Sequence, residues 1–270
     1  MSETCVPLAF CSSDLDQDGI VSVSDILILL SDFGIECPPE TAEWMCSNPV
    51  NYHGYNYATV QIGEQCWFAE NLRTELYQNG DFIPGGLSDG EWETTSSGAV
   101  AVYGEDSDSE CQDYSPDIDV CDPAQSLEEF GRLYNWYAVD DNGSLCPSGW
   151  HIPSDGEWMV MEMVLGMSES EANSEGSRGT DQGDQMKTTY GYSDSNNGSN
   201  SSGFSGLPGG GRLNTSGVFF GGAGSSGAWW SSSINASSAW SRGLGSNESV
   251  YRYSNSLRSG FSVRCLKDTE

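Results

Sequence analysis

The chain has 270 residues, of which 40 are acidic and 10 are basic, and its formal net charge is −30. Hydrophobic residues make up 37% of the chain, which is enough to build a core and excludes wholesale disorder. A field this negative repels phosphate backbones, so we expect no nucleic-acid partner. No apolar run approaches the roughly 18 residues of a membrane span, so we expect no membrane insertion.

The acidic residues are concentrated in the first two thirds of the sequence. Residues 1–177 contain 34 acidic and two basic side chains, whereas residues 178–270 contain six acidic and eight basic ones. Solubility alone accounts for many of the acids. The contrast nevertheless indicates that the C-terminal region has a different role.

Residues 14–25 carry the pattern of an EF-hand calcium loop. Loop positions 1, 3, 5 and 12 are aspartates, position 6 is Gly19, and position 7 offers a backbone carbonyl. Calcium requires six or more oxygen ligands, and glycine permits the sharp bend between them. An acidic turn without metal is the alternative. The sequence therefore predicts one calcium ion, with the ligands Asp14, Asp16, Asp18, Ile20 and Asp25.

An aspartate at position 12 makes this loop similar to those of dockerins. The apolar residues that follow, between 26 and 33, share one helical face, and Gly34 ends the helix. A dockerin carries two loop–helix repeats, but this sequence contains one. We expect calcium to brace a small module of residues 1–40, followed by a linker at residues 41–45.

The nine cysteines fit a disulfide framework better than a zinc site, because no Cys-x-x-Cys pair occurs and only two histidines are present. Disulfides indicate an oxidising compartment, so we expect a secreted or cell-surface protein. Closeness in the sequence suggests the pairs Cys46–Cys66 and Cys111–Cys121. Cys11 and Cys37 are expected to join the two ends of the calcium module.

Several elements of the main domain can be predicted from local patterns. Alternating residues over 55–69, with a turn at Gly63-Glu64, predict a β-hairpin. Residues 79–123 predict a long loop, and residues 127–138 a turn leading into an aromatic helix. A further helix is expected to begin at Ser154, with Glu157 completing a capping box. From residue 193 onward Gly, Ser and Asn dominate, and the interspersed Trp and Phe favour a loop-rich folded region over a linker.

Four separated segments of the main domain carry a family resemblance. They are residues 60–72, residues 131–137, residues 146–158 and the Gly-Phe-Ser-Val-Arg-Cys sequence of residues 260–265. In this order they are similar to the Fibrobacter succinogenes major paralogous domain, over about residues 46–268. That family resembles a branch of the C-type-lectin-like fold related to the formylglycine-generating enzymes. The resemblance implies an α+β, C-type-lectin-like, loop-rich domain at residues 46–270.

The same resemblance bears on disulfide pairing and on catalysis. In the resembled fold a cysteine before the first helix of the motif joins the last strand, which implies a Cys146–Cys265 disulfide. Formylglycine-generating enzymes use two reactive cysteines late in the chain, but no cysteine lies between these two positions. His151 is expected to be a packed residue rather than a base, and no acidic pair stands out as that of a glycosidase. We therefore expect no enzyme activity.

Calcium-dependent sugar binding is not expected either, because the Glu-Pro-Asn and Gln-Pro-Asp motifs of C-type lectins are absent. Residues 229–264 instead combine aromatic anchors with Ser, Asn, Tyr, Gly and Arg, the chemistry of adaptable binding surfaces. They also resemble the variable segment of C-type-lectin-like proteins diversified by retroelements. A polar loop region with structural aromatic residues is the alternative. The expected contact residues are Asn235, Gly245, Ser246, Asn247, Tyr251, Arg252, Tyr253, Asn255, Ser256, Arg258 and Ser259.

The sequence thus predicts a secreted or cell-surface ligand-binding protein without catalytic activity. Its ligand would be an extracellular protein or glycan surface, contacted by a C-terminal face with Arg252 and Arg258 at its positive centre. The alternative is a dockerin-bearing accessory component of an extracellular polysaccharide-degrading assembly.

Overall fold

The computed structural model describes residues 23, 44–105, 113–215 and 218–269. The chain divides into two units, Met1–Met45 and Cys46–Glu270. The predicted calcium loop apart from Val23, the helix after it and Cys11, Cys37 and Cys111 lie outside the described residues. In the part of the chain that is described, no helix has the length and hydropathy needed to cross a membrane.

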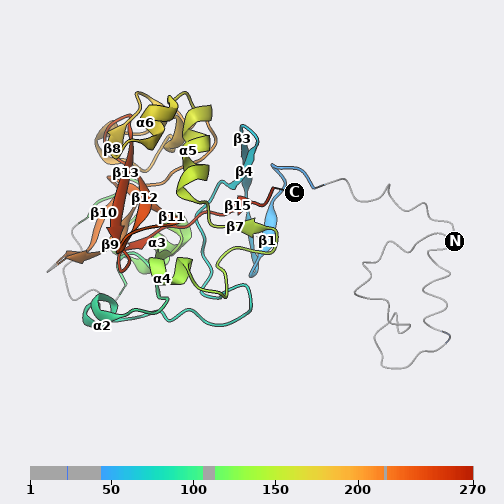
Figure 1. Cartoon of the computed structure of the whole chain (residues 1–270). Helices are drawn as coiled ribbons and strands as arrows, with labels where there is room; N and C mark the ends of the chain where they lie inside the picture. The colour runs from blue at the N-terminus through green and yellow to red at the C-terminus, as the bar shows by residue number, and fades with distance from the viewer. Residues whose placement is uncertain (1–22, 24–43, 106–112, 216–217, 270) are drawn as a thin grey trace. The chain divides into compact units, whose positions relative to one another are not determined.

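The larger unit is a mixed, sheet-rich α+β structure (Figure 1). Its main sheet has the strand order β5-β6-β14-β9-β11-β12-β13-β8, and β10 pairs with β9 outside this path. Most neighbours are antiparallel, and β11 meets β9 in parallel. The strands are β5 (Val100–Ala101), β6 (Leu133–Asn135), β8 (Gly176–Arg178), β9 (Gly209–Thr215), β10 (Val218–Ala223), β11 (Gly227–Asn235), β12 (Ser238–Leu244), β13 (Val250–Ser256) and β14 (Gly260–Phe261).

A second sheet of four strands brings together distant parts of the unit. Its order is β3-β4-β15-β7, so the last strand lies between two early ones. The β3–β4 hairpin turns at Gly63-Glu64, which confirms the predicted turn. Its strands are β3 (Thr59–Ile62), β4 (Gln65–Phe68), β7 (Trp150–His151) and β15 (Leu266–Lys267), and a separate ladder joins β1 (Val50–Tyr52) to β2 (Tyr55–Tyr57).

Short helices connect the strands. The predicted helix after Ser154 is present as α5, and Ser154 and Glu157 form its capping box as expected. The predicted long loop at 79–123 was wrong in part, since α2 forms there with a capping box of Ser88 and Glu91. The helices are α2 (Asp89–Thr94), α3 (Pro123–Phe130), α4 (Trp136–Val139), α5 (Asp155–Val164), α6 (Glu169–Asn173) and α7 (Gln182–Met186), with a 3-10 turn η2 (Ser193–Ser195).

Two further sequence expectations need correction. The aromatic helix expected within 127–138 is a single turn, α4, because α3 ends at Gly131, whose φ of 75° stops it, and residues 133–135 form the buried strand β6. The Gly- and Ser-rich region after residue 193 is not mainly loop but supplies β9 to β13. There, buried aromatic and arginine side chains outweigh the weak strand preference of Gly and Ser.

Disulfides and a buried arginine hold the last strand in place. The structure joins Cys146 to Cys265 and Cys46 to Cys66, the pairs that the resemblance and sequence proximity suggested. Cys121 is also disulfide-bonded. Arg264, next to Cys265, is fully buried, lies 4.1 Å from the Phe204 ring centre and donates to backbone carbonyls and to a side-chain amide. Burial lowers the pKa of Arg264 to about 9.

Candidate ligand-binding face

The register of β12 and β13 places alternate residues on opposite faces of the sheet. Gly243 lies opposite Tyr251, and Ser241 lies opposite Tyr253. Between these two pairs, Arg242 lies opposite Arg252 and points to the other side. The expected contact residues of β13 are therefore divided between an inner face, which packs on α5, and an outer face.

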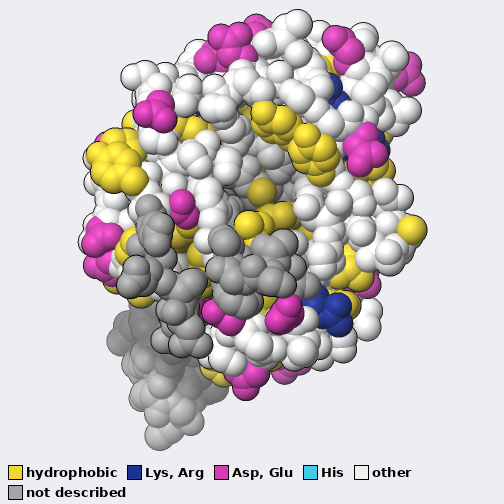
Figure 2. Space-filling view, turned by 90° about the vertical axis from the view of Figure 1, so that its left-hand side faces the viewer, with side chains coloured by type: hydrophobic (Ala, Val, Ile, Leu, Met, Phe, Trp, Pro, Cys, Tyr) yellow, Lys and Arg dark blue, Asp and Glu magenta, His cyan; other side chains and the backbone are white. Residues whose placement is uncertain are grey.

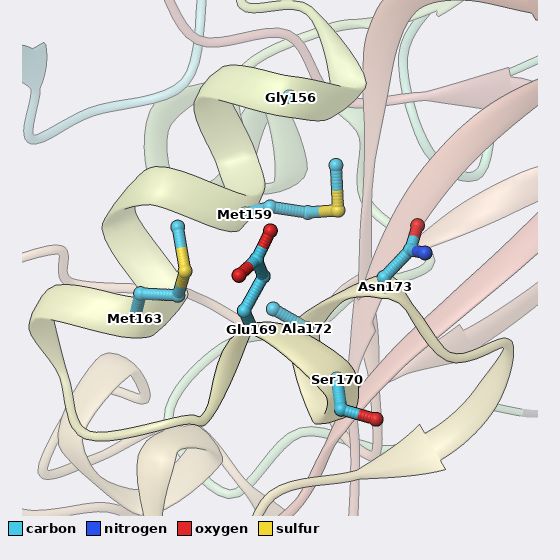
Figure 3. A pocket seen from close by; sticks show the side chains of 7 residues that line it. All are labelled: Gly156, Met159, Met163, Glu169, Ser170, Ala172 and Asn173. Atoms are coloured by element: carbon cyan, nitrogen blue, oxygen red, sulfur yellow. The ribbon is translucent and has the colours of Figure 1, made fainter.

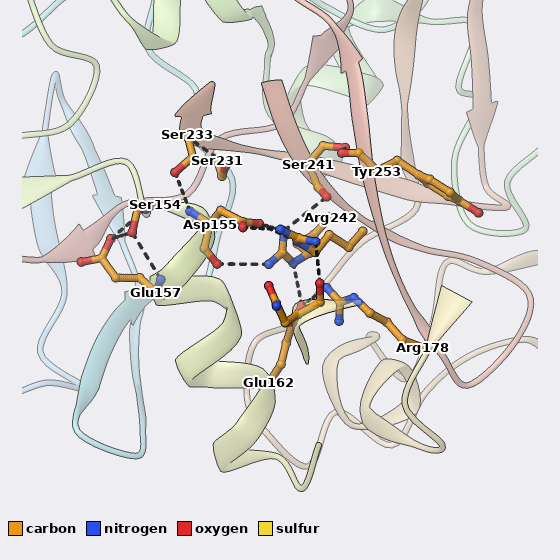
Figure 4. Close-up of polar contacts among 12 residues, drawn as sticks. Ser154, Asp155, Glu157, Glu162, Arg178, Ser231, Ser233, Ser241, Arg242 and Tyr253 are labelled. Carbon is orange, nitrogen blue, oxygen red and sulfur yellow. Dashed lines mark hydrogen bonds and ion pairs between the residues drawn. The ribbon is translucent and has the colours of Figure 1, made fainter. Parts of the chain in front are cut away.

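The inner face is fixed by a buried ionic network (Figure 4). Arg242 bonds to the Asp155 carboxylate at 2.7 Å and to the Glu162 carboxylate at 2.6 Å, and both carboxylates come from α5. Arg252 makes a second contact to Asp155 at 2.7 Å, and Arg178 of β8 reaches Glu162 at 2.9 Å. All five residues are buried, so this network ties the helix to three strands.

The network corrects the expected role of Arg252. Its guanidinium is buried, stacks 3.7 Å from the Trp240 ring centre and donates to the backbone carbonyl of Asn173. Burial alone would raise the pKa of Asp155, but the hydrogen bonds and charges of Arg252 and Arg242 outweigh burial and lower it. Arg252 therefore holds the sheet to the helices and is not a positive centre for a ligand.

The outer face presents a pair of tyrosines. The rings of Tyr251 and Tyr253 are nearly parallel, with an interplanar angle of 18° and centres 5.9 Å apart. Tyr253 is 45% exposed and Tyr251 is half-buried. In Figure 4 the Tyr253 side chain extends away from the arginine–carboxylate network. On the same face, the Asn255 amide donates to the Ser241 hydroxyl at 2.8 Å.

Tyr251 is held in place by glycines and by the β12–β13 loop. A Cβ atom added at Gly243 would lie 3.4 Å from Cβ of Tyr251, and one added at Gly245 would lie 3.6 Å from its ring atom Cε2. The Asn247 amide donates to the Tyr251 hydroxyl at 2.6 Å. Ring packing over glycine and this hydrogen bond fix the orientation of the ring.

A buried lysine anchors the same loop from beneath. The Lys187 ammonium group donates to the backbone carbonyls of Asn196, Gly245 and Asn247 at 2.7, 3.2 and 3.2 Å. Burial lowers the pKa of Lys187. Gly245 is itself buried, so it supports the loop through its carbonyl and is not the contact residue that we expected.

The remaining expected contact residues are distributed over the edge of the sheet. Ser246, Asn247 and Ser256 are exposed, and Asn235 is half-buried at the β11–β12 turn. Ser259 is buried, because the chain turns inward toward β14, which excludes it as a contact. Arg258 is half-buried and donates to the carbonyl of Thr95 at 2.8 Å.

The residues that support this face were not predicted from the sequence. Asp155 and Glu162 lie seven positions apart on α5, on the face that also buries Trp158. Carboxylates on an apolar helix face require cationic partners, and that signal was available in the sequence. Lys187 offered no such pattern, because its partners are backbone carbonyls of distant loops.

His151 joins the end of the chain to α5. Its Nδ1 lies 2.6 Å from the Asp268 carboxylate and its Nε2 lies 2.8 Å from the Glu157 carboxylate. The hydrogen bond with Glu157, followed by that with Asp268, raises the pKa of His151 against the effect of burial. Burial also opposes the shift of Glu157, but hydrogen bonds from His151 and Ser154 lower its pKa to about 2. With both ring nitrogens engaged, His151 is a structural link here.

A groove of about 490 Å³ lies between α5 and α6 (Figure 3). The Glu169 carboxylate points into it between the side chains of Met159 and Met163. Asn173, whose carbonyl accepts from Arg252, connects its wall to the ionic network. The lining residues are Gly156, Met159, Met163, Glu169, Ser170, Ala172 and Asn173.

Acidic side chains outnumber basic ones on the surface shown in Figure 2, as they do in the sequence. Figure 2 shows the side of the molecule on which β9, β10 and β13 lie in Figure 1, where acidic side chains are scattered and few basic ones reach the surface. Within residues 44–105, 113–215 and 218–269, no group of three or more His, Cys, Asp or Glu side chains could hold a metal ion. The calcium ligands expected from the sequence all lie outside these ranges.

Comparison with known proteins identifies the domain but no characterised relative. No curated protein and no solved structure matches the chain. The family model described as the Fibrobacter succinogenes major domain matches residues 60–267, which include the main sheet, all but the first residue of the four-stranded sheet, and the tyrosine pair. The chain therefore belongs to the Fibrobacter succinogenes major domain family.

Proposed function

We propose that the protein is a secreted or cell-surface ligand-binding protein without catalytic activity, and that its ligand binds the outer face of β12 and β13. One observation carries the proposal: Tyr251 and Tyr253 are presented to solvent by strands whose opposite side is fixed by a buried ionic network. Tyrosine contributes large contact area at low cost in conformational entropy, and neighbouring Ser and Asn supply hydrogen bonds. A rigid sheet beneath them reduces the cost of binding.

The proposed contact residues are the exposed or half-buried members of the expected set, apart from Arg258, whose guanidinium is bound to the Thr95 carbonyl. They are Asn235, Ser246, Asn247, Tyr251, Tyr253, Asn255 and Ser256. The retroelement resemblance of this segment adds a second line of support, since such segments diversify contact residues while the scaffold stays constant. A reverse-transcriptase gene beside the encoding locus, with a near-repeat of the codons for this segment, is the observation that tests it.

The experiment is a binding screen of the full chain on protein and glycan arrays. The variant Tyr251→Ala/Tyr253→Ala/Asn255→Ala should lose the ligand that the parent binds, while its thermal unfolding stays cooperative. Tyr190→Ala is a matched control, because Tyr190 is 48% exposed and lies outside this face. Equal binding by the triple variant and the parent would place the site elsewhere.

We infer a C-type-lectin-like arrangement, supported by the Cys146–Cys265 disulfide and by the last strand β15, which pairs with β4 and β7. The disulfides indicate an oxidising compartment, which supports secretion or surface display. An experimental structure of residues 46–270 would test the assignment directly.

The N-terminal unit is proposed to bind one calcium ion through Asp14, Asp16, Asp18, Asp25 and the Ile20 carbonyl. The support is the ligand spacing in the sequence, and extracellular sites of this kind can have dissociation constants of about 10⁻⁴ to 10⁻³ M. Calorimetry of the Asp14→Ala/Asp18→Ala variant should lose this binding event. Capture of a cohesin by the parent, and not by this variant, would favour the alternative function as a dockerin-bearing component of a polysaccharide-degrading assembly.

A further inference from the structure

We propose that the Tyr251–Tyr253 face binds a neutral polysaccharide, with sugar rings packed against the tyrosine rings. The inference rests on the proposed function and names the chemical class of its ligand. Three observations carry it: the geometry of the two rings, the neutral polar side chains beside them, and the way in which the rings are held.

The two rings form a small aromatic platform. They are separated by 5.9 Å along one strand and inclined by 18°, so their faces have nearly the same orientation. The residues opposite them on β12, Gly243 and Ser241, are small, so Tyr251 packs over Gly243 while 45% of the Tyr253 side chain stays exposed. A pyranose whose hydroxyls are equatorial presents C–H groups on its faces, and such apolar faces pack on aromatic rings. The exposed face of this stacked pair can therefore pack against the face of a sugar ring.

The polar groups around the platform are neutral. Ser246, Asn247, Asn255 and Ser256 offer hydroxyl and amide groups, which hydrogen-bond to sugar hydroxyls. Both arginines of the β12–β13 ladder point to the opposite face and are buried against α5. The charged side chain exposed in the connecting loop is a carboxylate, that of Glu248. Arg258, the half-buried cation of the expected set, is bound to the Thr95 carbonyl. An anionic polysaccharide would meet the Glu248 carboxylate and would be repelled by a chain of net charge −30.

The platform is ordered before any ligand arrives. The Asn247 amide holds the Tyr251 hydroxyl at 2.6 Å, and Lys187 holds the carbonyl of Asn247. Binding energy at protein interfaces is concentrated in anchors that fill well-packed, desolvated pockets, whereas Tyr253 is an exposed ring. Because the rings are already ordered, binding does not lose free energy in ordering them. This matters for neutral sugars, which bind weakly.

The test is affinity electrophoresis of the full chain in gels that contain a soluble polysaccharide. The probes are a mixed-linkage β-glucan, xylan and galactomannan, with polygalacturonate as the anionic comparison. At least one neutral polymer should retard the protein, and 0.5 M salt should leave the retardation unchanged. Tyr251→Ala and Tyr253→Ala should each weaken binding about tenfold, the loss expected for one aromatic contact.

Matched variants separate recognition from folding. Tyr253→Phe keeps the ring and should retain most of the binding, and Tyr190→Ala should bind like the parent. Absence of retardation by every neutral polymer, retardation by polygalacturonate alone, or unchanged binding by both alanine variants would overturn the inference. If no glycan binds but the triple variant loses a protein ligand in the array screen, the ligand class is wrong while the proposed function stands.

Discussion

The two faces of the β12–β13 ladder differ in almost every physical property, although they alternate along the same strands. On the inner face Arg242 and Arg252 are buried and paired with carboxylates of α5. On the outer face Tyr251 and Tyr253 contact solvent and are surrounded by Ser and Asn. One face fixes the strands to the helix, and the other can change in sequence without disturbing that attachment.

The comparison explains how a Gly-, Ser- and Asn-rich segment can form a stable sheet. Buried ion pairs contribute little net stability, but removal of one partner leaves an uncompensated buried charge. The inner face therefore fixes the strand positions and tolerates little change. The outer face carries no such penalty, so its residues are available for recognition. Four variants test this difference between the two faces.

The largest effect is expected for Arg242→Met. The substitution removes the guanidinium that bridges Asp155 and Glu162, and both carboxylates are buried. The free energy of unfolding should fall by about 3–5 kcal/mol. Urea unfolding followed by tryptophan fluorescence measures it, with Ser238→Ala on the same strand as a control. A loss smaller than about 1 kcal/mol would show that the network does not fix the sheet.

Lys187→Met should have an intermediate effect on stability. Its ammonium group serves three backbone carbonyls. Without it the buried bond to Gly245 and the part-buried bonds to Asn196 and Asn247 are lost, at a cost of about 1–3 kcal/mol. Because two of these carbonyls belong to the loop that holds Tyr251, amide hydrogen exchange at residues 245–249 should become faster. Unchanged exchange there would mean that the loop is held independently of Lys187.

The third variant, His151→Asn, compares the stability contributed by an ionic link at the surface with that of the buried arginine–carboxylate network. Its pKa is raised in the folded state, so its stabilisation is complete below about pH 6.5 and is lost as pH rises through the folded pKa. Glu157 has a lowered pKa, so its contribution is complete above about pH 4.5 and is lost as pH falls toward 2.

Both contributions are therefore complete only between these limits. Because the His151 side chain is 38% exposed, solvent screening should limit its share to less than about 1 kcal/mol. Unfolding free energies measured from pH 5 to 9 should fall with pH in the parent and less steeply in His151→Asn. Identical slopes for the two proteins would show that His151 contributes no pH-dependent stability.

The smallest change in stability is expected for Tyr253→Ala. This side chain is 45% exposed and its ring contacts one neighbour, so the free energy of unfolding should change by about 0.5 kcal/mol or less. Thermal and urea unfolding of the variant beside Arg242→Met compares the two faces directly. A loss close to that of Arg242→Met would make Tyr253 part of the scaffold and not of a contact surface.

Local sequence signals predicted the elements with strong local causes. The capping box of Ser154 and Glu157 and the turn at Gly63-Glu64 depend on residues within four positions of one another, and both are present. The strands after residue 193 depend on partners far away in the sequence. Their glycines and serines have low strand propensity, and the buried contacts of Trp229, Trp230 and the arginines stabilise them as a sheet.

The residue types of the candidate face were named from the sequence, but which of these residues point outward could not be predicted. Tyr251, Arg252 and Tyr253 are consecutive, and a mixture of residue types cannot tell which of them point inward. Once the segment is known to be a strand, alternation separates the arginine from the two tyrosines. Gly245 and Ser259 were misassigned for another reason, since their burial follows from the path of loops at the ends of β13.

The position of β15 determines when this domain can finish folding. That strand pairs with β4 and β7, and the adjacent Cys265 and Arg264 complete the long disulfide and a buried contact of the core. During synthesis the segment that carries the tyrosine pair emerges before these residues do. Contacts between the two ends of a chain also slow folding. The domain that carries the tyrosine pair is therefore complete only after its last residues have been added, and a chain shortened by a few residues would keep the tyrosines in sequence without the β15 contacts of the fold.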